Sequence, residues 1–203
     1  RAIKQINKTK MKKLLFVILI TFITHNYSIA EDKIISISEG NKDAKVNIIV
    51  YESLTCGHCA EFHKTIYPEI KKDFIDTGLA NIEFRNFPLN MAALNASKIA
   101  HCKNDGNSDI LHFLYKNQRK WVKGDTIEES NQNLKNLITN ENFNIDFEKC
   151  INNKLVEDYI LEDRIKGVKK FEINATPTLV IDNKKLKDPF NYKKIKKTLE
   201  KLI

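Results

Sequence analysis

Two cysteines three residues apart, Cys56 and Cys59, form the strongest chemical feature of the sequence. They follow an apolar run rich in β-branched residues, 46–51, and precede apolar side chains at helical spacing. We therefore expect a buried strand and then a helix that begins at the cysteines. A helix N-terminus carries unpaired N–H groups and partial positive charge, so the pKa of the Cys56 thiol is predicted to fall below its ordinary value of about 8.5. His58 adds a proton donor or positive charge, Cys56 would exchange with another thiol, and Cys59 would resolve the mixed disulfide.

A zinc site and a purely structural disulfide are the alternatives for this pair. Zinc needs further ligands, and the only other close pair, His101 and Cys102, lacks zinc-finger spacing. A structural disulfide between cysteines this close in sequence is uncommon. The pattern favours a redox pair and predicts neither a metal nor an organic cofactor.

Thr176-Pro177 stands directly before a predicted strand at residues 178–182. A proline at the start of a strand can hold a cis peptide bond, and such bonds are rare enough to suggest a purpose. Placed against the cysteine pair, this segment would offer a backbone edge to an extended substrate peptide. Taken alone, Pro177 is better explained as a trans proline in a turn, but its position after a cysteine–helix unit favours substrate binding.

The other two cysteines, Cys102 and Cys150, lie 48 residues apart in a stretch of predicted helices. An even number of cysteines in an exported chain favours disulfides. A disulfide closing this loop would contribute about 4 kcal/mol to stability. We expect a structural disulfide, with two unpaired thiols or a second redox pair as alternatives.

The remaining histidines carry less weight. His63 falls on the helix after Cys56, where an exposed face is expected rather than a functional role. His101 and His112 are expected on helix surfaces or in packing contacts. Core positions, rather than a ligand-binding box, are expected for Phe113, Tyr115 and Trp121.

The patterns of apolar residues outline a βαβ unit, a helical stretch and a ββα unit. The predicted strands are residues 33–38, 46–51, 82–87, 178–182 and 184–187. The predicted helices are residues 56–70, 91–102, 109–121, 127–139, 155–168 and 191–203. This order predicts an α/β fold in which helices separate two strand-containing halves.

Residues 1–30 have the features of a signal peptide. A charged start at Met11 is followed by an apolar run at 14–20, and small residues end at Ala30, after which cleavage is expected. The run is shorter than the roughly 20 residues of a membrane span. An uncleaved anchor and a buried helix are the alternatives, and residues 1–10 precede the expected start.

The formal net charge of +8 is concentrated in this leader. Six of the 34 basic residues and no acidic ones precede Glu31, which leaves 28 basic and 26 acidic residues, a balance of +2. Nucleic-acid binding would require Lys and Arg concentrated in the folded part. No nucleic-acid partner is therefore predicted.

Taken together, these motifs resemble the DsbA family, and most closely its alphaproteobacterial branch. The resemblance covers nearly all of residues 31–203 and rests on segments 56–63, 87–89, 101–102 and 174–178. It implies a thioredoxin-like fold, a central mixed sheet with flanking helices, interrupted by an inserted helical domain. Residues 31–90 and 171–203 would form the thioredoxin-like domain and residues 91–170 the insertion.

The resemblance also implies a function. It predicts a periplasmic protein dithiol oxidase that acts on unfolded or newly exported cysteine-containing proteins. A membrane partner of the DsbB type would re-oxidise it, and a monomer without a cofactor is expected. A second disulfide occurs in the helical domain of that branch, and Cys102 with Cys150 match it.

Two features depart from the family pattern. The usual dipeptide between the cysteines is Pro-His, whereas Gly57-His58 is the dipeptide of protein disulfide isomerases. Many relatives carry an acid six residues before the first cysteine, where this chain has Val50. Glu52 stands two residues later, on the same strand face, and is our candidate for the proton acceptor.

Three rival functions follow from the sequence. A disulfide isomerase or reductase uses the same chemistry. A peptide-binding chaperone would leave the thiols without turnover, and a thiol-based metallochaperone would bind zinc or copper through them.

Overall fold

The computed structural model describes residues 33–141 and 143–203. The predicted leader, with its cleavage after Ala30, lies outside the described residues. Within the described ranges, no helix combines the length and the apolar composition needed to cross a membrane.

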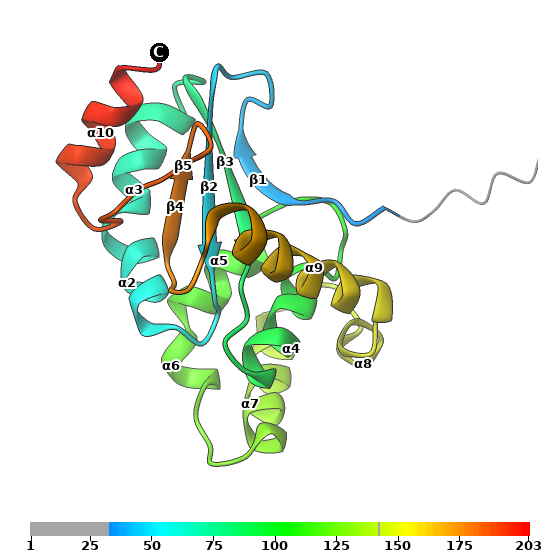
Figure 1. The fold of residues 1–203 in the computed structure, drawn as a ribbon. Helices are drawn as coiled ribbons and strands as arrows, with labels where there is room; N and C mark the ends of the chain where they lie inside the picture. The colour runs from blue at the N-terminus through cyan, green and yellow to red at the C-terminus, as the bar shows by residue number, and fades with distance from the viewer. Residues whose placement is uncertain (1–32, 142) are drawn as a thin grey trace, which may run out of the picture. The chain divides into compact units, whose positions relative to one another are not determined.

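A mixed five-stranded sheet lies at the centre of the fold (Figure 1). Its strands are β1 (Ile37–Gly40), β2 (Val46–Glu52), β3 (Ala80–Asn86), β4 (Thr178–Ile181) and β5 (Lys184–Lys185), in the spatial order β1-β3-β2-β4-β5. β2 and β3 are parallel, as the predicted βαβ unit requires, and the other neighbouring strands are antiparallel. The predicted mixed sheet is therefore confirmed.

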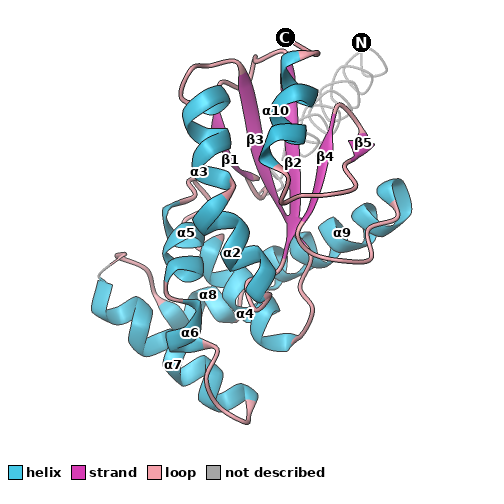
Figure 2. Cartoon of the chain, turned by 90° about the vertical axis from the view of Figure 1, so that its left-hand side faces the viewer, coloured by secondary structure: helices cyan, strands magenta, loops and turns pink. Residues whose placement is uncertain are grey.

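Helices cover both faces of this sheet. One face carries α2 (Gly57–Thr65), α3 (Tyr67–Ile70), the π-helix η1 (Lys71–Ile75) and α10 (Tyr192–Glu200), and Figure 2 shows α2, α3 and α10 on one side of the strands. Phe62 of α2 belongs to the same buried cluster as Val50 of β2. Successive strand residues point to opposite faces, so Tyr51 instead packs with Phe171 at the end of α9 (Lys154–Phe171).

The chain between β3 and β4 is helical. It forms α4 (Met91–Ala100), α5 (Asp109–Lys116), α6 (Gln118–Trp121), α7 (Ile127–Glu141), α8 (Phe147–Ile151) and α9. α9 also lies against the sheet, because Asp163 binds Arg85 at 2.7 Å and Gly167 leaves room for the Tyr51 ring. Residues 34–203 pack as one compact unit, so the domain boundaries at residues 90 and 170 remain predictions.

Several predicted element boundaries were wrong. The first strand spans 37–40 rather than 33–38, and the hairpin's second strand stops at Lys185. The helix predicted over 56–70 is interrupted at Ile66, which is the C-cap of α2. Pro68 lies in the first turn of α3 and has no N–H to bond back into the preceding turn, which explains the break.

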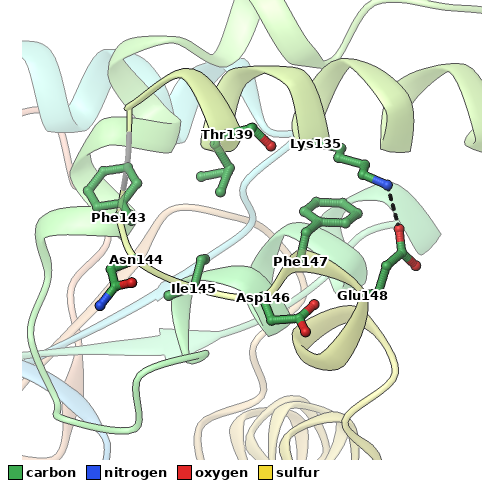
Figure 3. A pocket seen from close by; sticks show the side chains of 9 residues that line it. Lys135, Thr139, Phe143, Asn144, Ile145, Asp146, Phe147 and Glu148 are labelled. Atoms are coloured by element: carbon green, nitrogen blue, oxygen red, sulfur yellow. Dashed lines mark hydrogen bonds and ion pairs between the residues drawn. The ribbon is translucent and has the colours of Figure 1, made fainter.

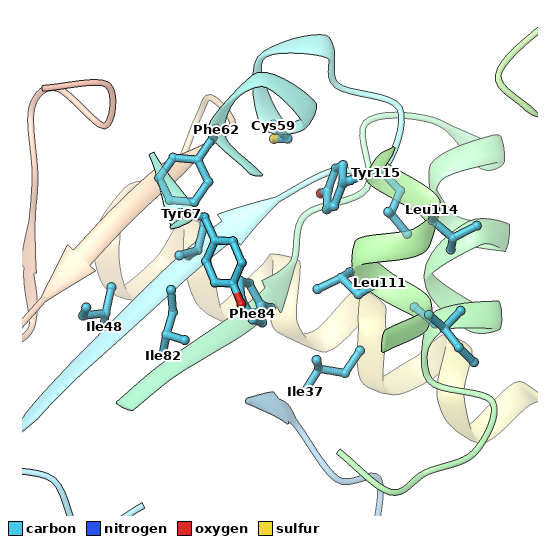
Figure 4. Packing of buried hydrophobic residues seen from close by; sticks show 14 of the residues in the cluster. Ile37, Ile48, Cys59, Phe62, Tyr67, Ile82, Phe84, Leu111, Leu114 and Tyr115 are labelled. Atoms are coloured by element: carbon cyan, nitrogen blue, oxygen red, sulfur yellow. The ribbon is translucent and has the colours of Figure 1, made fainter. Parts of the chain in front are cut away.

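The core between the sheet and α2 also receives side chains from α5. Figure 4 shows Cys59 and Phe62 of α2 directed toward the strands, with Leu111 and Tyr115 entering from α5. Cys59 and Phe62 have no exposed surface, and Tyr115 is 4% exposed. The predicted core positions of Tyr115 and Trp121 are confirmed, while Phe113 is half-buried and packs on Phe143 with ring centroids 5.0 Å apart.

Candidate active site

Cys56 occupies the N-cap of α2, four residues after the end of β2. Its backbone is extended, and its Sγ makes no capping hydrogen bond, so the half-exposed thiol is free to react. The loop before it is held from α6, because Gln118 Nε2 donates to the carbonyls of Leu54 (2.8 Å) and Cys56 (3.0 Å). Sequence reasoning missed Gln118, since nothing near it in the chain marks this contact.

The surroundings of Cys56 favour its thiolate. Hydrogen bonds from the Cys59 thiol, from Thr176 and from the backbone N–H groups of Cys59 and His58 lower the pKa of Cys56 to about 5, against the opposing effect of burial. The predicted direction of the shift agrees with this result. At neutral pH the Cys56 sulfur is therefore a thiolate, the form that both attacks and leaves in disulfide exchange.

Cys59 has the opposite environment. The residue is fully buried, and burial, together with the neighbouring Cys56 and Glu52, raises the pKa of its thiol far above the ordinary value. It therefore remains protonated while Cys56 is charged. The structure holds both as free thiols, which corresponds to the reduced state of the pair.

Thr176 and Pro177 lie directly against Cys56. The peptide bond between them is cis, and in its protonated form the Cys56 thiol donates to the Thr176 carbonyl at 3.3 Å. With Cys56 as a thiol, the buried Thr176 hydroxyl has no hydrogen-bond partner among the described residues, so it can donate to the sulfur once Cys56 ionises. Thr178 Oγ1 stabilises the loop by donating to the Ala175 carbonyl at 2.7 Å.

A groove of about 390 Å³ runs past this segment. Its lining includes Pro177, Leu186 and Phe190 with the exposed His58, whose ring lies 6.1 Å from that of Phe190. The groove therefore places apolar surface beside the reactive sulfur. The sequence indicated His58 and Pro177 but not Phe190, which lies far along the chain.

Glu52, the candidate proton acceptor, is buried at the end of β2 on the face covered by α2. Its Oε2 lies 2.7 Å from His63 Nε2. Its Oε1 has no hydrogen-bond partner among the described residues, and its charge raises the pKa of Cys59. The predicted strand face of Glu52 therefore agrees with the structure, while its role stays a prediction.

The prediction for His63 was wrong. Its side chain is only 5% exposed, because α5 covers the face of α2 that local spacing assigned to solvent. The ring stacks on Tyr115 at 4.1 Å, and its Nδ1 lies 3.1 Å from Nδ1 of His112. A pair of histidines, one buried and the other half-buried, thus reaches the active-site acid.

Known proteins resemble this chain both in sequence and in fold. The sequence model described as thioredoxin matches residues 33–201. The crystal structure of alpha-DsbA1 from Wolbachia pipientis aligns with a TM-score of 0.72 and 28% identity over 82% of this chain and 90% of that one. The chain belongs to the DsbA family.

Other relatives agree. The oxidised BdbD from Bacillus subtilis aligns with a TM-score of 0.69 and 26% identity, over 82% of this chain and 92% of that chain. A relative from Rickettsia bellii, whose name is that of a protein-disulfide oxidoreductase, is 31% identical over 147 residues. This match covers 70% of the present chain but 55% of the relative, so the chain spans about half the length of that protein.

The second cysteine pair lies away from the site. Cys102 follows the end of α4 and forms a disulfide with Cys150 of α8, with the two Cα atoms 5.2 Å apart. The neighbouring His101 is buried, and its Nε2 lies 3.0 Å from Nδ2 of Asn86. Burial lowers the pKa of the His101 imidazole to about 4. The disulfide joins the end of α4 to α8, whereas Cys56 and Cys59 lie at the start of α2, so this DsbA-family chain has two cysteine pairs in different environments.

The sequence predicts no metal at this site. Among residues 33–141 and 143–203, no group of three or more His, Cys, Asp or Glu side chains has a metal-binding arrangement.

A separate pocket of about 550 Å³ lies between the end of α7 and α8 (Figure 3). It contains the Lys135–Glu148 ion pair (2.8 Å) but no cysteine or histidine, and so lacks the groups for thiol chemistry.

Proposed function

We propose that this chain is an exported protein dithiol oxidase, which donates the Cys56–Cys59 disulfide to cysteine-containing proteins. The observation that carries the proposal is the contrast within the pair. Cys56 is half-exposed with a pKa of about 5, while Cys59 is buried with a strongly raised pKa. A stable Cys56 thiolate favours the reduced pair, and a protein whose reduced form is stabilised is an oxidant.

The reaction would proceed in two exchanges. A substrate thiolate attacks Sγ of Cys56 in the oxidised pair, the Cys56–Cys59 bond breaks, and Cys59 leaves with the bonding electrons and takes up a proton. A second substrate thiolate then attacks the substrate sulfur of the mixed disulfide and displaces Cys56 as a thiolate. The substrate loses two electrons and gains a disulfide, and the pair is left reduced.

The substrate would lie along Thr176-Pro177. The segment before β4 is partly exposed, and the neighbouring groove offers Leu186 and Phe190 to apolar side chains that flank a substrate cysteine. Main-chain hydrogen bonds to an extended peptide would position the substrate without selecting its sequence. His58 stands at the same groove, where it would contact the incoming thiol.

Glu52 would exchange the Cys59 proton. Since the Glu52 charge raises the Cys59 pKa, we expect Glu52→Gln to lower that pKa. Because glutamine cannot supply a proton to the leaving sulfur, we also expect slower release of Cys59 from the disulfide. Thiolate absorbance against pH in Cys56→Ser, with and without Glu52→Gln, measures the effect. An unchanged titration would remove Glu52 from the mechanism.

The location and the partners form part of the same proposal. The leader pattern at residues 1–30 supports export to the periplasm, and a disulfide such as Cys102–Cys150 persists in an oxidising compartment. We propose that unfolded or newly exported proteins are the substrates, that a membrane partner of the DsbB type restores the disulfide, and that the chain acts as a monomer. Residues 91–170 would serve as the helical insertion beside the thioredoxin-like parts.

The equilibrium reduction potential of the Cys56–Cys59 pair against glutathione tests the proposal. It is measured on the full chain and on Cys102→Ala/Cys150→Ala, so that only one pair responds in the variant. We expect a reduction potential of about −120 mV in both proteins. A value near about −270 mV would identify a reductant and overturn the oxidase function.

Disulfide isomerisation is the second candidate, and Gly57-His58 favours it. A Cβ at Gly57 would meet no atom within 4 Å, so the space around the motif does not impose glycine. A potential near about −180 mV, together with faster rearrangement of a scrambled disulfide protein than oxidation of a reduced one, would support this candidate.

A further inference from the structure

A line of hydrogen-bonding groups connects the active-site acid to the molecular surface. We propose that His63 and His112 form a proton relay, which carries the proton exchanged by Cys59 between Glu52 and the surface at Glu39. The relay rests on the proposed thiol–disulfide function and adds to it the residues that move the proton.

The line contains three contacts from four different elements. Glu52 Oε2 of β2 lies 2.7 Å from His63 Nε2 of α2, and His63 Nδ1 lies 3.1 Å from His112 Nδ1 of α5. His112 Nε2 lies 2.6 Å from Oε1 of Glu39 in β1. All three distances fall within the range of hydrogen bonds, so the line is continuous.

The number of hydrogens in this line allows a proton to be transferred along it. Three hydrogen bonds require three hydrogens, but two neutral imidazole rings carry only two N–H groups. The third hydrogen either makes one ring an imidazolium between two carboxylates, or it lies on Glu52 while both rings are neutral. The arrangements differ in which side of the Glu52–His63 and His63–His112 hydrogen bonds holds the proton, so a proton can be transferred by shifts within existing hydrogen bonds.

Aromatic rings form walls beside the inner part of the line. Tyr115 stacks on His63 at 4.1 Å, Tyr67 stacks on His112 at 4.7 Å, and Phe84 lies within 5.5 Å of both histidine rings. Burial raises the pKa values of both tyrosines, so neither wall competes for the proton near neutral pH.

The outer end is charged and accessible. The His112 side chain is 27% exposed, compared with 5% for His63. Glu39 also accepts from Ser108 (2.6 Å) and Tyr67 (2.6 Å) and faces Lys71 at 3.1 Å. Despite the opposing effect of burial, the hydrogen bonds from His112, Ser108 and Tyr67 hold the Glu39 pKa well below its ordinary value. Glu39 thus keeps a fixed negative charge where protons enter from solvent.

The inner end faces the group that needs the proton. Cys59 has no exposed surface, yet it must gain one proton when it leaves the disulfide and lose one when the pair is re-oxidised. The free Oε1 of Glu52 and the influence of its charge on Cys59 place the acid at this step. Glu52 would give its proton to the Cys59 thiolate, His63 would replace it, and one proton would enter from solvent through His112. No electron moves along the line.

A groove beside the relay makes a chemical rescue experiment possible. It has a volume of about 730 Å³ and is lined by both His63 and His112, so a small base can reach the line after a histidine is truncated. The test measures the single-turnover rate at which dithiothreitol reduces the oxidised Cys56–Cys59 pair in the full chain. His112→Ala and His63→Gln are compared with His101→Gln, which changes a buried histidine outside the relay.

We expect His112→Ala and His63→Gln to slow this reduction by about tenfold or more, as the loss of general acid catalysis does. Added imidazole should restore the His112→Ala rate, while acetate at equal ionic strength should not, and His101→Gln should reduce at the wild-type rate. A solvent deuterium isotope effect seen in the wild type should change in His112→Ala. An unchanged rate in His112→Ala, or a lowered rate that imidazole does not restore, would overturn the relay.

The reductant in this test is a small dithiol, so the result does not depend on protein substrates. A reduction potential of about −270 mV would contradict the proposed oxidase function. The relay would then still be tested by the reduction rates of the histidine variants. If the Cys56–Cys59 pair has an oxidising potential but imidazole does not restore the His112→Ala rate, the relay is contradicted and the oxidase function is not.

Discussion

The two cysteine pairs of this chain show how position sets the behaviour of one chemical group. Cys56 lies at the N-terminus of α2, where the helix dipole is positive, and Cys102 follows the C-terminus of α4, where it is negative. A thiolate is favoured at the first position and disfavoured at the second. Cys56 is also surrounded by hydrogen-bond donors, whereas Cys102 is bonded to Cys150 and packs on the hydrophobic core.

The chain separation of each pair reinforces the contrast. Cys56 and Cys59 are three residues apart on one helix, so their disulfide closes almost no loop and adds little to stability. Cys102 and Cys150 are 48 residues apart and join α4 to α8. One pair is therefore suited to cycling between its states, and the other to holding the helical part together.

Replacing Cys56 by Ser should have the largest effect on function. The variant loses the sulfur that forms the mixed disulfide, so oxidation of a dithiol peptide should fall to the uncatalysed rate. Cys102→Ala/Cys150→Ala is the matched control and should retain most of the wild-type turnover. Equal losses in the two proteins would mean that the pairs do not divide the roles as proposed.

The same double variant should show the largest effect on stability. The loop-closure relation for 48 residues gives a decrease of about 4 kcal/mol in the free energy of unfolding. Urea unfolding without reductant measures it, with the Cys56–Cys59 pair in the same redox state in both proteins. A decrease comparable to that of a surface substitution would contradict the structural role.

The pH dependence of the reduced protein sharpens the contrast further. The Cys56 pKa is about 5 in the folded state, below the value of about 8.5 expected when unfolded. Its contribution to stability is therefore fully present above about pH 8.5, shrinks as the pH falls, and is lost below about pH 5. Thiolate absorbance should titrate near pH 5, and the stability difference between reduced wild type and Cys56→Ser should close over the same range.

A titration midpoint near the ordinary value for cysteine would show that the helix and its neighbours do not stabilise the thiolate. Because disulfide-bonded cysteines do not titrate, the wild type should show one transition in this range. The variant lacking Cys102 and Cys150 should show the same transition.

Thr176→Val should produce the smallest of these effects. It removes one hydroxyl donor to the thiolate, worth about 1.5 kcal/mol for a charged acceptor, and should raise the Cys56 pKa by about one unit. Thr178→Val is the matched control, because that hydroxyl bonds to the Ala175 carbonyl rather than to sulfur. The absorbance titration distinguishes them, and equal shifts in both variants would indicate a change in the loop rather than a lost hydrogen bond.

Local patterns were sufficient for the reactive pair and for the strands that support it. The apolar run at 46–51 and the cysteine at the following N-cap are neighbours in sequence, so their relation depends only on strand and helix geometry. Element ends were harder to predict. The break at Ile66 depends on one missing N–H, and the short β1 depends on its pairing with β3.

The histidines show why the rest required the fold. Glu39, His63 and His112 lie on three elements and are brought together by the pairing of β1 and by the packing of α5 on α2. Each residue alone matches an ordinary surface position, which explains why His63 was assigned to an exposed face. A histidine at each of two distant helices carries no local signal of contact.

The thiol chemistry of this protein can be predicted from local sequence, because a thiol pair at a helix N-terminus and a proline before a strand are local arrangements. The surroundings that control this chemistry depend on how the folded chain packs. Burial of Cys59 and Glu52, the contact of Thr176 with Cys56, and the line from Glu52 to Glu39 join residues far apart in the chain. Such contacts arise from packing, which no periodicity within one segment records.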